Sequence, residues 1–111
     1  IIVNVSGGYG PTETDENSVL VKSQEKTLKQ AGIEYTLSPR LGGSWPGVIF
    51  TGPPLKLPAV GFGIGTGGGA HAPNEWYLVE SKNPKLAGLD EATMFYVDYL
   101  YELAETAKAA R

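Results

Sequence analysis

Cysteine is absent from the 111 residues of this chain, and histidine and methionine occur once each. Without thiols the chain can form neither a disulfide framework nor a thiolate metal site. Basic charge is also scarce, with 9 Lys and Arg residues against 12 Asp and Glu residues. This balance predicts no surface for nucleic acid.

Long hydrophobic runs and targeting segments are missing as well. No apolar stretch reaches the roughly 18 residues that a membrane-spanning helix needs, and no signal-peptide pattern is present. We therefore expect a cytoplasmic protein with no membrane partner. The composition, 41% hydrophobic and 19% charged, is that of one ordinary folded domain. The chain begins with Ile1 and not with Met, which is compatible with a processed form, a trimmed chain or a part of a longer protein.

Two segments have the pattern of helices. Residues 18–31 carry a capping residue at the start, Asn17 or Ser18, and Gly32 stands where a helix ends. Residues 89–109 predict a long amphipathic helix with acidic groups in its first turn. We expect its core-facing stripe to contain Ala92, Phe95, Tyr96, Tyr99, Leu100 and Leu103.

The remaining hydrophobic segments predict strands over 1–6, 33–37, 57–65 and 76–80. A short helical turn is expected within 38–50, where two prolines and a double glycine stand. The order β-α-β-β-β-α predicts a layered α/β/α domain with a mixed sheet and a long C-terminal helix.

The single histidine, His71, lies in the stretch GGGAHAPNEWY, residues 67–77. Imidazole is the commonest metal ligand among side chains. The preceding glycines would let the backbone approach a ligand closely, and Asn74 or Glu75 could orient a bound group through hydrogen bonds. An ordinary loop histidine is the alternative.

The glycines of the same region also match a dinucleotide-binding pattern. Residues 63–68, GIGTGG, fit G-x-G-x-x-G after a predicted strand. That fingerprint requires a helix at the third glycine, and the continuation GAHAP is poor helix material. We regard dinucleotide binding as the less favoured interpretation.

Three blocks of the sequence resemble the M20 family of metallohydrolases, which includes aminoacylases, carboxypeptidases and dipeptidases. GAHAPNE resembles its last histidine block, and PRLGGSWPGVIF resembles the R-x-G-G-S-x-P block of carnosinase-like dipeptidases. VSGGYGPTETDENSVLV is similar to the segment where such chains leave the small lid domain and re-enter the catalytic domain. Relatives also include succinyl-diaminopimelate desuccinylases and acetylornithine deacetylases.

The resemblance implies an organisation and a set of roles. Residues 1–12 would end the lid, or dimerisation, domain, and residues 13–111 would form the C-terminal part of a zinc-peptidase-like catalytic domain. His71 would be a metal ligand, with Asn74 and Glu75 supporting it. Ser44 would bind the substrate carboxylate, together with the backbone of Gly43 and with Arg40.

The resemblance further implies amide-bond hydrolysis of peptides or N-acyl amino acids with one or two zinc ions, or cobalt or manganese. A metal-bound water would attack the amide carbon, and a carboxylate base would accept its proton. The other metal ligands and that base would come from the N-terminal remainder of the catalytic domain, because nothing in this chain matches them. We therefore expect no catalytic residue here, an inactive isolated chain, and a possible homodimer through the lid domain. The alternative is a non-catalytic α/β binding module or structural fragment.

Overall fold

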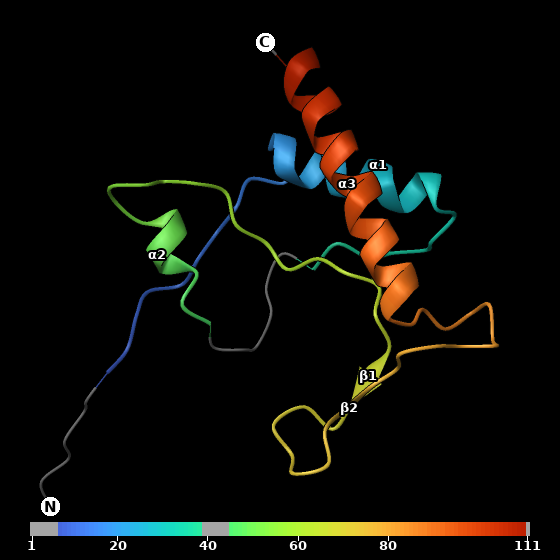
Figure 1. Cartoon of the computed structure of the whole chain (residues 1–111). Helices are drawn as coiled ribbons and strands as arrows, with labels where there is room; N and C mark the ends of the chain where they lie inside the picture. The colour runs from blue at the N-terminus through green and yellow to red at the C-terminus, as the bar shows by residue number, and fades with distance from the viewer. Residues whose placement is uncertain (1–6, 39–44, 111) are drawn as a thin grey trace, which may run out of the picture.

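The computed structural model describes residues 7–38 and 45–110. Within these ranges the elements are α1 (Val19–Gln30), α2 (Val48–Thr51), β1 (Gly67–Gly68), β2 (Trp76–Tyr77) and α3 (Leu89–Ala109). Figure 1 shows α1 crossing α3, with α2 standing apart from both and the β1–β2 pair lying beyond the N-terminal end of α3. The two long helices and the short helical turn confirm the sequence predictions for those segments.

Helix α1 begins and ends where its sequence predicts. The Ser18 hydroxyl accepts a hydrogen bond from the Val21 N–H at 3.3 Å, which satisfies one of the free amides of the first turn. Beyond the C-cap, Gly32 has a φ of 67°, a left-handed conformation that glycine adopts without steric cost. The Ile33 N–H then donates to the Leu28 carbonyl at 2.9 Å and closes the helix end.

Helix α3, like α1, begins at a capping interaction. The Glu91 carboxylate accepts a hydrogen bond from the Gly88 N–H at 3.0 Å, and Asp90 adds a second negative charge to the first turn. Lys108 lies in the last turn. Both ends therefore carry the charge that the helix dipole favours.

The core is the contact between α1 and α3. Its fully buried positions on α1 are small or polar: Ser23 is 0% exposed and Thr27 is 1% exposed. The Thr27 hydroxyl donates to the Ser23 carbonyl at 2.8 Å, so its burial leaves no unsatisfied donor. On α3 the buried side chains are Ala92, Phe95, Tyr99 and Thr106, and two of them, Phe95 and Tyr99, are large aromatic rings. Small residues on one helix therefore accommodate bulky ones on the other.

A polar cluster closes one side of this helix pair. Glu102 accepts hydrogen bonds from Thr106 at 2.7 Å and Gln30 at 2.9 Å, and it forms an ion pair with Lys26 at 3.2 Å. These partners stabilise the carboxylate, with the Thr106 hydroxyl the largest contributor and Lys26 next, and they lower the pKa of Glu102. The cluster thus links the first helix to the last.

An aromatic contact fastens the segment 57–65 to α3. The Phe62 ring lies 5.1 Å from the Phe95 ring and 4.7 Å from the Tyr99 ring, measured between centroids. Such tilted pairs stabilise a core beyond the area that they bury.

The strands differ most from the sequence predictions. The one ladder in the described ranges pairs Gly67 with Tyr77 and Gly68 with Trp76, antiparallel. Residues 33–37 form no strand, and within 57–65 only Gly65 forms a bridge, to Ala87. A strand needs a neighbour to pair with. Apart from that bridge, no segment within 7–38 or 45–110 forms a ladder with these residues, and the Thr14 hydroxyl bonds the backbone of Ala59 at a single point. A layered α/β/α arrangement therefore stays a prediction, since a two-stranded ladder cannot test it.

The chain leaves much of its apolar surface uncovered. Its radius of gyration is 17.2 Å, whereas a compact domain of this length has about 13 Å. Its accessible surface is 9126 Å², about 3,200 Å² more than a compact protein of this mass exposes.

None of the helices in the described ranges has the length and apolarity needed to cross a membrane.

Candidate functional site

The histidine loop, which we define as residues 69–75, connects β1 to β2. Two consecutive turns shape it: the Ala72 N–H donates to the Gly69 carbonyl at 2.9 Å, and the Glu75 N–H donates to the Ala72 carbonyl at 3.1 Å. His71 is the third residue of the first turn. The β1–β2 ladder thus holds the loop at both ends and places His71 near its tip.

His71 has a φ of 65°. Turns that need a positive φ at the third position usually place Gly or Asn there, so a histidine accepts a conformational cost. Strained residues of this kind are concentrated at functional sites, although strain alone does not define a function. The side chain is exposed, and the imidazole makes no hydrogen bond or ion pair with any residue that the structure describes. Both ring nitrogens are therefore available to an external ligand.

Asn74 and Glu75, predicted to support His71, lie on the same loop and are exposed. Neither forms a side-chain hydrogen bond within the described part of the chain. Gly69 has a φ of 71°, in the left-handed region that favours glycine, and a Cβ there would make ordinary van der Waals contact, at 3.4 Å, with the Asn74 carbonyl oxygen and the Glu75 Cα. The geometry explains the glycine before Ala70 but shows no contact between Asn74 or Glu75 and the imidazole.

The described residues do not form a complete metal site. Across 7–38 and 45–110, no three His, Asp or Glu side chains gather in a way that could hold an ion. A hydrolytic zinc ion needs about three protein ligands. By its chemistry and accessibility His71 suits the role of one ligand, and the residues around it do not supply the others. The predicted substrate-carboxylate residues Arg40, Gly43 and Ser44 lie outside the described residues.

The glycine-rich segment before the loop has its own geometry. Chain positions after Gly68 form a turn and then β2, and the next helix is α3, which begins at Leu89. The helix N-terminus that would hold a pyrophosphate in the dinucleotide motif is therefore absent from this segment as the structure describes it. The G-x-G-x-x-G match does not produce that motif's binding geometry.

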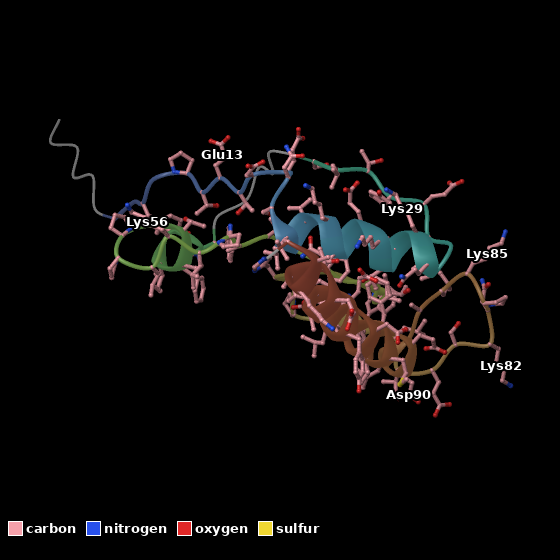
Figure 2. All side chains as sticks on the ribbon, turned by 90° about the horizontal axis from the view of Figure 1, so that it is seen from above. Glu13, Lys29, Lys56, Lys82, Lys85 and Asp90 are labelled. Atoms are coloured by element: carbon pink, nitrogen blue, oxygen red, sulfur yellow. The ribbon has the colours of Figure 1, made fainter. Side chains whose placement is uncertain are left out.

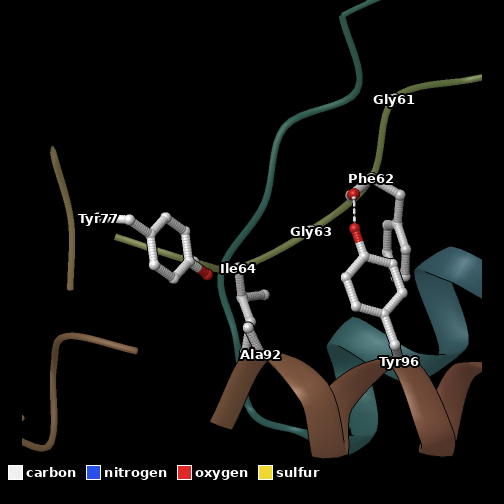
Figure 3. A pocket seen from close by; sticks show the side chains of 8 residues that line it. Gly61, Phe62, Gly63, Ile64, Tyr77, Ala92 and Tyr96 are labelled. Atoms are coloured by element: carbon white, nitrogen blue, oxygen red, sulfur yellow. Dashed lines mark hydrogen bonds between the residues drawn. The ribbon is translucent and has the colours of Figure 1, made fainter. Parts of the chain in front are cut away.

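Three of these glycines, Gly61, Gly63 and Gly65, line a hollow of about 510 Å³, which is shown in Figure 3. Its floor is Ala92 of α3, and its sides are Tyr77 and Tyr96. The Tyr96 hydroxyl donates to the Phe62 carbonyl, and a Cβ at Gly65 would overlap the Tyr77 hydroxyl. Sequence reasoning placed Tyr96 in the core and did not single out Tyr77. The alternation of glycines at 61, 63, 65 and 67 was the signal that could have indicated a close approach of side chains.

Comparison with known proteins adds no relative, because no family model, curated protein or solved structure matches the chain.

Proposed function

We propose that this chain is the C-terminal part of a metal-dependent hydrolase of the M20 type, which cleaves amide bonds of peptides or N-acyl amino acids. In this proposal His71 supplies one metal ligand. The single observation that carries it is the presentation of His71: an exposed imidazole, without a partner among the described residues, at a φ of 65°, which is uncommon for residues other than glycine.

Two further features support the proposal. The order of the three sequence blocks matches the order that the family's chain would have. The uncovered surface of about 3,200 Å² is what a domain part would expose if other segments packed against it. In a complete domain, segments 33–37 and 57–65 would gain neighbouring strands and become part of a layered α/β/α sheet. Ser44, Gly43 and Arg40 would then bind the substrate carboxylate.

The chain's own contribution to the chemistry would be positioning. Because the histidine loop is held between β1 and β2, the His71 imidazole would approach the metal ion from a fixed direction. The loop would cover one side of the metal site. Because the described residues offer no second ligand and no placed base, we derive no catalytic step from this chain. The water-activating groups would lie in the N-terminal remainder.

The test compares two variants in the full-length parent protein. His71→Ala should lower the metal content and abolish hydrolysis of dipeptides and N-acyl amino acids supplied with zinc, cobalt or manganese. Lys56→Ala is the matched control, since Lys56 is also exposed and has a φ of 48°. It should change neither metal content nor turnover. Full metal content and turnover in the His71 variant would refute the ligand role.

The isolated chain provides a second measurement. Titration calorimetry with zinc should show only weak binding, because one histidine cannot build a site, and the isolated chain should hydrolyse none of these substrates. Hydrolysis by the isolated chain, or its absence in the parent, would contradict the proposal. An inactive parent without metal would favour a non-catalytic binding module.

A further inference from the structure

A short segment, residues 60–64, lies across α3, and we call it the strap. Half-buried apolar side chains alternate with exposed glycines along it: Val60, Gly61, Phe62, Gly63 and Ile64. Figure 3 shows the Phe62 side chain beside Tyr96 and the Ile64 side chain pointing toward Ala92. Ala92 is 5% exposed and forms the floor of the hollow that the strap lines. The strap therefore covers part of α3.

Hydrogen bonds fasten the chain on both sides of the strap. Before it, the Thr14 hydroxyl donates to the Ala59 carbonyl at 2.9 Å and accepts from the Ala59 N–H at 3.0 Å. After it, the Thr66 N–H donates to the Ala87 carbonyl at 3.0 Å, and the Leu78 N–H donates to the Thr66 carbonyl at 2.8 Å. The strap is thus a short span with two fixed ends.

The middle of the strap is held mainly through one residue, Phe62. Within residues 60–63 one backbone group takes part in a hydrogen bond with another described residue: the Phe62 carbonyl accepts from the Tyr96 hydroxyl. The Phe62 ring adds the contacts with Phe95 and Tyr99, and it meets the Tyr96 ring edge-on at 6.1 Å between centroids. No ladder of backbone hydrogen bonds has to break when this ring leaves α3.

The α1–α3 pair has contacts of its own that do not involve the strap. Ser23 and Thr27 of α1 are at most 1% exposed. Glu102 of α3 binds Lys26 and Gln30 of α1. Figure 2 shows α1 lying along α3, with α2 apart from both. These contacts stay in place when Phe62 moves away.

We propose that the strap opens as a unit while α1 and α3 stay folded, and that the hydrogen bond from Tyr96 to Phe62 is its latch. Segments held by few contacts open at a lower free energy than the whole molecule. Gly61 and Gly63 lack side chains, so the backbone on each side of Phe62 can turn without steric cost. Opening uncovers Ala92 and frees the backbone of the strap to pair with another strand. This device does not depend on the proposed function.

Thiol labelling tests the opening, because the chain has no cysteine of its own. Ala92→Cys places a thiol under the strap, and Thr27→Cys places one in the α1–α3 contact. When each rate is divided by its rate in concentrated urea, Ala92→Cys should react roughly tenfold faster or more. Its rate should also change little in dilute urea, since opening the strap exposes little surface. Equal normalised rates would overturn the proposal, because unfolding of the whole chain would then uncover both thiols.

Tyr96→Phe, added to Ala92→Cys, tests the latch. Loss of the hydroxyl should raise the labelling rate by about two- to tenfold, the worth of one hydrogen bond. Tyr101→Phe is the matched control, since Tyr101 is 72% exposed and forms no hydrogen bond with a described residue. It should leave the rate unchanged. An unchanged rate with Tyr96→Phe, or an equal rise with Tyr101→Phe, would refute the latch.

Chymotrypsin provides a measurement that needs no added cysteine. Cleavage after Phe62 requires the strap to leave α3, whereas cleavage after Tyr99 requires the α1–α3 pair to open. In the unsubstituted chain the initial rate of the first cut, followed by mass spectrometry, should exceed that of the second by about tenfold or more. Circular dichroism of each variant checks that its helix content is unchanged. Similar rates for the two cuts would overturn the proposal even if Ala92→Cys failed to fold.

Discussion

The Phe95→Ala substitution tests whether the α1–α3 pair is the core of this chain. Phe95 is 4% exposed, and its ring contacts Phe62 at 5.1 Å between centroids. Loss of the buried ring costs about 1.5–3 kcal/mol in transfer free energy, and the cavity raises the total to about 3–5 kcal/mol. A domain of ordinary stability has only about 5–15 kcal/mol. The variant should therefore lose a large part of the chain's stability at 25 °C.

The matched control is Phe50→Ala, the same substitution at a ring that is 47% exposed on α2. Urea unfolding, followed by circular dichroism at 222 nm, should give a loss below about 1.5 kcal/mol for the control, since half of the ring's burial is missing. Equal losses in the two variants would refute the assignment of the core to the α1–α3 contact.

Two further predictions concern single residues. Because its partners lower the pKa of Glu102 below the ordinary value of 4.5, the carboxylate stabilises the fold above that pH, and the stabilisation is lost as the pH falls through the lowered pKa. Glu102→Gln should thus reduce the urea midpoint at pH 7 and leave it unchanged in strong acid; an equal loss at both pH values would contradict the charge role. Gly32→Ala should cost about 1 kcal/mol, since φ there is 67° and the new Cβ would meet nothing within 4 Å. The control Gly61→Ala, equally open and outside the left-handed region, should cost nothing in the same urea experiment; a comparable loss there would remove the conformational explanation.

The helices could be predicted because their signals are local. Ser18 and Gly32 mark the two ends of α1 within one turn of the helix itself, and the long α3 has sustained periodicity. The buried stripe was only partly right: Phe95 and Tyr99 are buried, whereas Leu100 is 61% exposed. Within the part of the chain that the structure describes, α3 packs mainly on α1 and on Phe62, so the covered stripe is narrower than the apolar pattern.

The strands and the candidate site depend on groups distant in the sequence. Residues 57–65 have strand composition, but pairing requires a neighbour that a local pattern cannot supply. The sequence likewise singled out His71, but its positive φ and free imidazole come from the two turn hydrogen bonds and the β1–β2 register. The hollow beside Tyr77 and Tyr96 arises from three separate segments, and its one local signal is the alternation of glycines at 61, 63, 65 and 67.

The pairing of the first long helix with the last has a consequence for how the chain is connected. Because α1 ends at Gln30 and α3 begins at Leu89, their contact closes a loop of roughly 60 residues, whose chain-entropy cost is about 3–4 kcal/mol. The contact is therefore slow to form compared with either helix. A single proteolytic cut in the exposed loop 82–86 would leave two pieces held together by the helix pair, by the packing of Phe62 on α3 and by backbone hydrogen bonds such as that from the Leu89 N–H to the Val79 carbonyl. Their association would then depend on concentration, as in a split protein.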